Sequence, residues 1–376
     1  MLLFADHHEQ GRRLPAAAIQ ALPGRIRGCE RWLLALPLLW ITCQPLGAQA
    51  PPADDVKPVP LLTGSAGFIT TFDGGETHLG PIVTPVVLIP LGQRWLFEAR
   101  GNFESDLVAV PGQSGFHGAV EKSVDYAQLD FIANPYITVT LGRFLTPFNI
   151  YNERLYPVWI RDLQTDPLIL PIGVGPSNAS NGAMVRGGFK AHPAFDFDLN
   201  YAVYFSTLNS TEYIDSARFA GGRAGIFIPK TRLEFGGSFQ HSLEEGRSNS
   251  FGFHAIWEPI ALPLEIRAEY ARSFQGSGYW GEAAYRLGQF PYLEKQLRRT
   301  QIVGRMQQSL VGASPSTSLF PTNMKMFEVG LNYYFIDGFK GVASYGREFS
   351  GDGNKNVWTL GLTYRFVIPL GNAWRN

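Results

Sequence analysis

The sequence predicts an all-β protein, a transmembrane antiparallel β-barrel of about 16 strands. Three observations favour this fold. Apolar and polar residues alternate strictly near the C-terminus, similar segments recur along the chain, and the joins between them alternate between short and long. A period of two is the pattern of a β-strand, and a closed barrel leaves no unpaired strand edge in lipid.

The clearest alternation is the segment VWTLGLTYRF, from Val357 to Phe366. Its apolar or aromatic face consists of Trp358, Leu360, Leu362, Tyr364 and Phe366, and its other face of Thr359, Gly361, Thr363 and Arg365. A lipid-facing barrel strand has this pattern. A single such strand could equally belong to a soluble β-sandwich, so the rest of the chain has to decide between the two folds.

The N-terminus has the features of a secretory signal peptide over residues 1–50. Five arginines precede the short apolar run Trp32 to Thr42, and Ala48-Gln49-Ala50 offers a small-x-small cleavage site. The run is too short for a spanning helix. The Pro-rich segment 51–60 follows as a predicted periplasmic lead-in, and residues 61–376 are the predicted barrel.

Composition limits the partners of the exported chain. The whole chain has 32 basic and 32 acidic residues, and removing the five arginines and three acidic residues of the signal leaves 27 and 29. This near-neutral balance argues against a nucleic-acid partner. Both cysteines, Cys29 and Cys43, leave with the signal, so disulfides cannot stabilise the mature protein. A sheet closed by hydrogen bonds can do so instead.

Segments with strand character follow one another after the lead-in, each long enough for a tilted strand across a bilayer. They are 61–73, 79–91, 94–106, 123–133, 136–144, 182–191, 195–206, 217–228, 231–241, 249–258, 263–273, 278–287, 298–307, 324–335, 339–349 and 357–368. The weakest is 79–91, because it is apolar on both faces and contains Pro81, Pro85 and Pro90.

Joins after even-numbered segments are mostly short, as periplasmic turns should be, and several joins after odd-numbered segments are long. The longest join, residues 145–181, lies between the fifth and sixth strands. It is rich in Leu, Ile, Pro, Tyr and Trp, so we expect it to be folded rather than disordered. A barrel of this size encloses a lumen that can receive it. We therefore expect an infolded loop that narrows a channel.

The strand count and this long loop resemble the bacterial porins of the 16-stranded superfamily. The stretch Leu141 to Asn152 (LGRFLTPFNIYN) is similar to the Gly-Arg-Phe-x-x-Pro-Phe-Gly motif of porins related to the phosphate-selective O/P type, with Asn149 where Gly often stands. The pattern around Phe366 is similar to the assembly signal of outer-membrane barrels, although ten more residues follow it. The resemblance implies a bacterial outer-membrane location, a homotrimer and assembly by the barrel-assembly machinery.

Charged residues at predicted inward positions must face water or partners, because a charge in lipid is costly. The candidates for the pore wall are Arg100, Glu98, Asp130, Arg186, Arg223, Arg232, Arg267, Arg286, Arg305 and Arg365, and further inward carboxylates are Asp196, Asp198, Glu234, Glu265, Glu269, Glu282 and Glu328. These charges could line a water-filled pore and sort solutes. They could equally form salt-bridge networks in a plugged lumen.

The long join supplies the candidates for the constriction, which are Glu153, Arg154, Arg161, Asp162 and Asp166. An alternative is that these residues only attach the loop to the wall. The sequence shows no catalytic constellation, metal-ligand spacing or phosphate loop, so neither an enzyme nor a cofactor is predicted.

The predicted function is passive diffusion of small hydrophilic solutes, anions among them, through an outer-membrane channel. Two other functions stay open. One is an outer-membrane enzyme of the lipase or protease kind, and the other is a secreted soluble β-sandwich that binds a ligand.

Overall fold

The computed structural model describes residues 59–174, 178–191, 196–244, 247–289, 294–312, 318–351 and 353–371. The predicted signal peptide and most of the lead-in lie outside these residues. The described chain forms 16 strands, in agreement with the predicted segments. They are β1 Leu61–Asp73, β2 Glu76–Leu91, β3 Trp95–Ala109, β4 His117–Asn134, β5 Ile137–Leu145, β6 Ala179–Lys190, β7 Asp198–Thr207, β8 Phe219–Ile228, β9 Leu233–Ser242, β10 Asn249–Trp257, β11 Leu264–Arg272, β12 Gly276–Arg286, β13 Thr300–Val311, β14 Met324–Ile336, β15 Phe339–Ser350 and β16 Gly353–Pro369.

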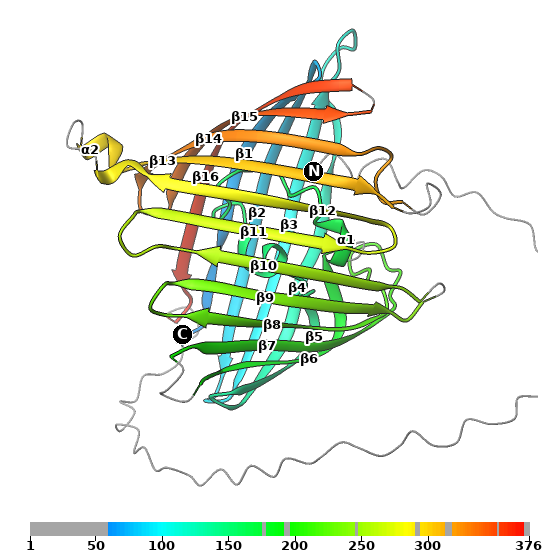
Figure 1. The fold of residues 1–376 in the computed structure, drawn as a ribbon, viewed down its shortest axis with the longest axis vertical. Helices are drawn as coiled ribbons and strands as arrows, with labels where there is room; N and C mark the ends of the chain where they lie inside the picture. Colours follow the sequence, from blue (N-terminus) through cyan, green and yellow to red (C-terminus); the bar gives the residue numbers. More distant parts are fainter. Residues whose placement is uncertain are drawn as a thin grey trace, which may run out of the picture. The chain divides into compact units, whose positions relative to one another are not determined.

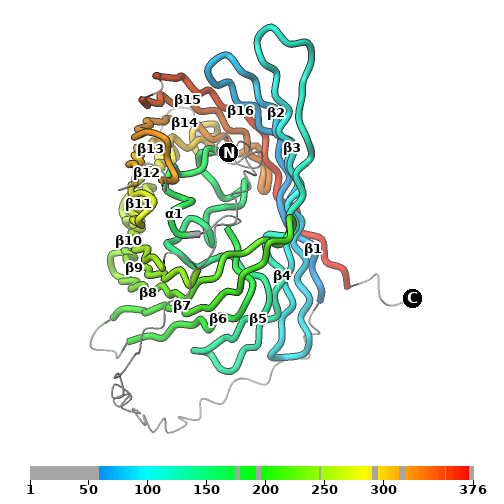
Figure 2. The backbone as a smooth tube through the Cα atoms, turned by 90° about the vertical axis from the view of Figure 1, so that its right-hand side faces the viewer, coloured from blue at the N-terminus to red at the C-terminus, as the bar shows by residue number. Residues whose placement is uncertain are grey.

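The strands form one closed antiparallel barrel in which each strand pairs with its sequence neighbours (Figures 1 and 2). Closure comes from β1 and β16, which pair along the whole of β1, from Leu61 opposite Pro369 to Asp73 opposite Val357. The ring therefore has no free edge. The soluble β-sandwich alternative is wrong, because a sandwich consists of two sheets and this chain forms one closed sheet.

The two faces of the strands differ as the alternation predicts. On β16, Trp358, Leu360 and Leu362 are exposed, whereas Thr359 and Thr363 between them are buried. On β14 the exposed apolar residues include Phe327, Val329, Leu331 and Phe335, and the buried polar ones are Glu328 and Asn332. Apolar side chains thus cover the outside of the barrel, and polar side chains point inward.

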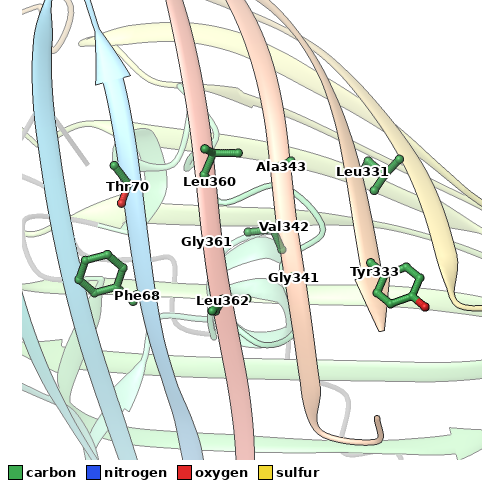
Figure 3. Close-up of a pocket in the computed structure, with 10 residues that line it drawn as sticks. All are labelled: Phe68, Thr70, Leu331, Tyr333, Gly341, Val342, Ala343, Leu360, Gly361 and Leu362. Atoms are coloured by element: carbon green, nitrogen blue, oxygen red, sulfur yellow. The ribbon is translucent and has the colours of Figure 1, made fainter. Parts of the chain in front are cut away.

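A shallow apolar groove marks this outer face across β1, β14, β15 and β16 (Figure 3). Gly341 and Ala343 lie at its floor, and larger residues such as Phe68, Leu331 and Leu362 line it. An outer barrel surface of this kind is expected to contact the acyl chains of the membrane rather than water.

Strand β2, predicted as the weakest, pairs with both neighbours. Its pairing with β3 keeps one register but skips Gly80–Pro81 and Thr84–Pro85. Proline has no backbone N–H to donate, which explains an interrupted ladder at these positions.

The joins follow the predicted parity at several places. Short joins include Pro135–Tyr136 after β4 and Asp337–Gly338 after β14, and the long join after β5 spans 146–178 because β6 begins at Ala179. The join after β12 is longer than the two short joins just named and contains a 3-10 helix, Leu287–Gln289, and the short helix α2, Glu294–Leu297. No helix in the described ranges is long and apolar enough to cross a membrane.

Candidate functional site

The join 146–178, called the β5–β6 loop below, is a folded segment. It contains a π-helical turn, Tyr151–Leu155, and the short helix α1, Pro171–Val174. In Figure 2, α1 lies within the outline of the strands. Seven of its apolar residues join two wall residues and Phe320, from the join after β13, in one buried cluster, which consists of Phe148, Ile150, Tyr151, Leu155, Ile169, Leu170, Ile172, Ala271, Trp280 and Phe320. The apolar content that predicts an ordered loop is therefore buried against the barrel.

The start of the loop is held by a carboxylate on β11. Glu269 accepts hydrogen bonds from the backbone nitrogens of Ile150 and Tyr151, both at 2.7 Å, and from the indole nitrogen of Trp280 at 2.9 Å. Glu269 is 5% exposed. A buried carboxylate is stabilised by several charge-assisted hydrogen bonds of this kind.

Asn149 makes the turn that leads into this contact. Its φ of 55° lies in the left-handed region, which favours glycine and tolerates asparagine. The porin motif that residues 141–152 resemble often has Gly at this position. The left-handed conformation explains why Asn is accepted here. The Asn149 backbone nitrogen donates to the Ser238 hydroxyl at 2.9 Å, and its side chain donates to the Tyr270 carbonyl at 3.2 Å. Gly252 leaves room for it, since a Cβ there would lie 2.1 Å from the Asn149 side-chain oxygen.

The later part of the loop is attached to β13, β14 and β15. The Leu168 backbone nitrogen donates to the Gln307 side chain at 3.0 Å, and Asn332 donates to the Asp162 carbonyl at 3.0 Å. Lys340 is 1% exposed, and its ammonium donates to the carbonyls of Trp159 and Arg161 at 2.9 and 2.6 Å. Inward side chains therefore satisfy loop backbone groups that would otherwise be buried without a partner.

All five constriction candidates form ion pairs. Those with the wall are Glu153 with Arg223 at 2.5 Å, Arg154 with Glu234 at 2.8 Å and Asp162 with Arg267 at 3.1 Å. Within the loop, Arg161 pairs with Asp166 at 2.8 Å. The three pairs with the wall attach the loop to the barrel, which is the alternative role considered for these residues.

The loop also contacts the opposite side of the barrel. The Arg100 guanidinium on β3 lies 5.5 Å from the centre of the Tyr156 ring, and the Arg161 guanidinium lies 4.7 Å from it. Arg100 pairs with Asp125 on β4 at 3.0 Å. Both guanidiniums are within the range of a cation–π contact. We call this group, Arg100, Tyr156 and Arg161, the Arg–Tyr–Arg contact.

The remaining wall candidates are distributed around the ring. Asp130 on β4 pairs with Arg186 on β6 at 3.1 Å, and Glu98 is half-buried on the same face of β3 as Arg100. Arg305 pairs with Glu282 at 2.7 Å in a site where both side chains are buried. Several predicted inward charges are therefore paired with charges of the opposite sign.

Arg232 is not a wall residue, and its assignment needs correction. It precedes β9, has a φ of 50°, is exposed and pairs with Glu258 in the neighbouring turn. The turn before β9 interrupts the period of two, so alternation continued through it places Arg232 on the wrong face.

A second group of residues lines a cavity of about 600 Å³ at the end of the barrel with the short joins. Three predicted wall arginines, Arg267, Arg286 and Arg365, come together there. Sequence reasoning missed Arg298 and Arg299, which precede β13, and the aromatic residues Trp159 and Tyr334. For Arg298 and Arg299, the length of the join after β12 was the one signal in the sequence.

In the described ranges, no group of three or more metal-ligating side chains could hold a metal ion. The prediction that the protein needs no cofactor stays a prediction.

Comparison with known proteins concerns the fold. No protein-family model and no curated protein matches the sequence. Among solved structures, OprB of Pseudomonas putida has a TM-score of 0.54 at 9% identity, covering 82% of this chain and 92% of its own. The trimer form of OmpT, an outer membrane protein of Vibrio cholerae, has a TM-score of 0.53 at 10% identity, covering 82% and 100%. A variant of the Rh. blastica porin has a TM-score of 0.50 at 12% identity, also covering 82% and 100%.

At these identities the likeness is one of fold. The closed 16-stranded barrel and its apolar exterior indicate a bacterial outer-membrane β-barrel protein. The resemblance to the phosphate-selective O/P type stays a prediction.

Proposed function

We propose that the protein is an outer-membrane porin that passes small hydrophilic solutes, with the β5–β6 loop as the constriction of its lumen. One observation carries the proposal. The same loop contacts Glu269 on β11 and Arg100 on β3, and these strands are eight positions apart in a ring of 16. Strands half a ring apart lie on opposite sides of a barrel, so a loop that contacts both crosses the lumen.

This arrangement would divide the lumen and narrow the path for solutes. Tyr156 contacts Arg100 on β3, and the paired charges Arg161 and Asp166 lie beside it. Fixed charges in a narrow passage act on a solute at short range, so they influence both size exclusion and charge selectivity. Arg100 and Asp125 supply charges of both signs from the other wall.

The ion pairs bear on the alternative of a plugged lumen. A loop that only filled the barrel would also be attached by buried pairs, so pairing alone does not separate a plug from a constriction. Conduction does separate them, because water and ions must pass beside the loop of a porin.

The test is single-channel recording in planar lipid bilayers. The wild-type protein is expected to give discrete conductance steps. Deletion of Val158 to Pro171, which removes the part of the loop next to Tyr156, is expected to raise the conductance and weaken size exclusion. Deletion of the exposed tip 112–115 between β3 and β4 is the control and should leave conductance unchanged.

Absence of conductance steps in the wild-type protein would contradict the porin function. Conductance that is unchanged by the Val158 to Pro171 deletion would contradict the constriction. Both deletion variants must first show the same heat-modifiable gel mobility as the wild type. This check excludes loss of conductance that is caused by misfolding of the barrel.

Assembly as a homotrimer is part of the proposal. The trimer form of the similar OmpT structure supports it, although the identity is only 10%. Sedimentation or cross-linking of the protein in detergent would measure the number of subunits directly.

A further inference from the structure

The cavity at the short-join end has an excess of positive charge. Its lining includes five arginines, Arg267, Arg286, Arg298, Arg299 and Arg365. It includes three carboxylates, Asp162, Glu265 and Asp337. The lining therefore has an excess of two positive charges, in a space of a size that small-molecule sites often have.

The carboxylates do not neutralise the arginines evenly. Asp162 and Glu265 both pair with Arg267, at 3.1 and 2.5 Å. Asp337 pairs with Arg365 at 3.4 Å, and the Asp337 side chain is 95% exposed, so water screens this pair strongly. The two positive charges in excess therefore lie on the other arginines of the lining rather than on Arg267.

Arg286 and Arg299 have other partners. The Arg286 guanidinium lies 4.8 Å from the centre of the Tyr334 ring, and Arg299 donates to the Phe335 carbonyl at 2.9 Å. Within the described part of the chain, neither has a carboxylate at ion-pair distance. Both guanidiniums keep hydrogen-bond donors for a further acceptor, because a guanidinium has five N–H groups.

The aromatic residues hold this side of the cavity in place. The Tyr334 hydroxyl donates to the Gln301 side chain at 3.0 Å, and its ring contacts Trp159 edge-on at 6.3 Å between centroids. Trp159 in turn lies between Lys340 and Arg365, at 5.5 and 5.8 Å from its ring centre. The rings of Tyr334 and Trp159 each contact a cation already. The remaining space therefore favours an anionic ligand over an aromatic one.

We infer that this cavity binds small solutes with two negative charges on oxygen, namely dicarboxylates or phosphate groups, through Arg286 and Arg299. Guanidinium groups match both carboxylate and phosphate oxygens in geometry, and two such groups can bind a dianion together. The inference deepens the proposed function, since it names a class of solute that the lumen would collect at this mouth.

The experiment is isothermal titration calorimetry on the full mature chain in detergent, at low salt and at a pH where phosphate is a dianion. The probes are succinate, inorganic phosphate and acetate, the last as a monoanion of similar chemistry. Succinate or phosphate is expected to bind more tightly than acetate. The double variant R286Q/R299Q is expected to weaken that binding about tenfold or more, as loss of charge-assisted hydrogen bonds does.

R232Q is the matched control. Arg232 lies in the turn between β8 and β9, also at the short-join end, but it is paired with Glu258 and does not line the cavity. This variant removes one positive charge at the same end and should bind like the wild type. Equal loss in R232Q would mean that general charge, not the cavity, attracts the anions.

Binding of succinate alone would identify dicarboxylates, and binding of phosphate alone would identify phosphate groups. If neither dianion binds better than acetate, or if R286Q/R299Q binds as well as the wild type, the inference is wrong. Bilayer recordings separate this failure from that of the porin proposal. Conductance without dianion binding would overturn only the site, and binding without conductance would overturn only the channel.

Discussion

The Glu269 carboxylate lies 2.7 Å from the backbone nitrogen of Tyr151, and this contact joins β11 to the start of the β5–β6 loop. The same oxygen accepts from Ile150, so one side chain satisfies two backbone N–H groups of a turn. Further along the same loop, the Tyr156 ring contacts the Arg100 guanidinium on β3.

Replacing Glu269 with Ala should loosen the loop. The change leaves two backbone N–H groups and the Trp280 indole N–H without an acceptor, and each buried unpaired donor costs about 1–3 kcal/mol. We expect larger and noisier single-channel currents. E258Q, at a partly exposed residue that follows β10, is the control. If the currents of E269A are as small and as quiet as those of the wild type, Glu269 does not hold the loop.

Replacing Tyr156 with Ala should widen the passage, because its ring lies between Arg100 and Arg161. Y156F keeps the ring and its cation–π contacts, which contribute about 0.5–2 kcal/mol each. Conductance should therefore rise in Y156A and stay close to the wild-type value in Y156F. A rise of the same size in both variants would mean that the ring itself does not narrow the channel.

Replacing Arg161 with Ala should shift permeability towards cations. The change leaves the Asp166 carboxylate without the guanidinium now 2.8 Å away. The reversal potential in a salt gradient measures the shift. The double variant R161A/D166A removes both charges and should return the reversal potential towards the wild-type value. A persistent shift in the double variant would point to altered loop structure rather than to charge.

Replacing Gly252 with Ala should displace Asn149, because the added Cβ would lie 2.1 Å from the Asn149 side-chain oxygen. Limited proteolysis of the folded protein should then cut the loop faster. G304A is the matched control, since no atom lies within 4 Å of a Cβ at Gly304. Equal cleavage rates in the two variants would contradict the packing of Asn149 against β10.

The closed barrel should resist SDS at room temperature and unfold only on boiling. Every strand is paired on both sides, from β1 with β16 around the ring, so SDS finds no free edge at which to begin unfolding. Gel mobility of boiled and unboiled samples is the measurement. Identical mobility and identical circular dichroism spectra would argue against closure.

The strands and the loop differ in how far they could be predicted. Alternation is a local property, so Trp358, Thr359 and Leu360 could be assigned to opposite faces without knowledge of their neighbours. Arg232 shows the limit of that method, because a turn with a positive φ interrupts the count. The loop could be recognised by its length and apolar content. The wall residues that it contacts could not be predicted.

Local periodicity and the spacing of turns are enough to predict the number of strands, the lipid-facing side of several of them and the position of the long loop. The folded structure is needed to show that Tyr156 contacts Arg100, that Glu269 accepts from Tyr151, and that Arg286 and Arg299 line the same cavity. These contacts depend on closure of the ring. Pairing β1 with β16 places β3 opposite β11 and joins distant strand ends at one mouth, and no local pattern encodes those distances.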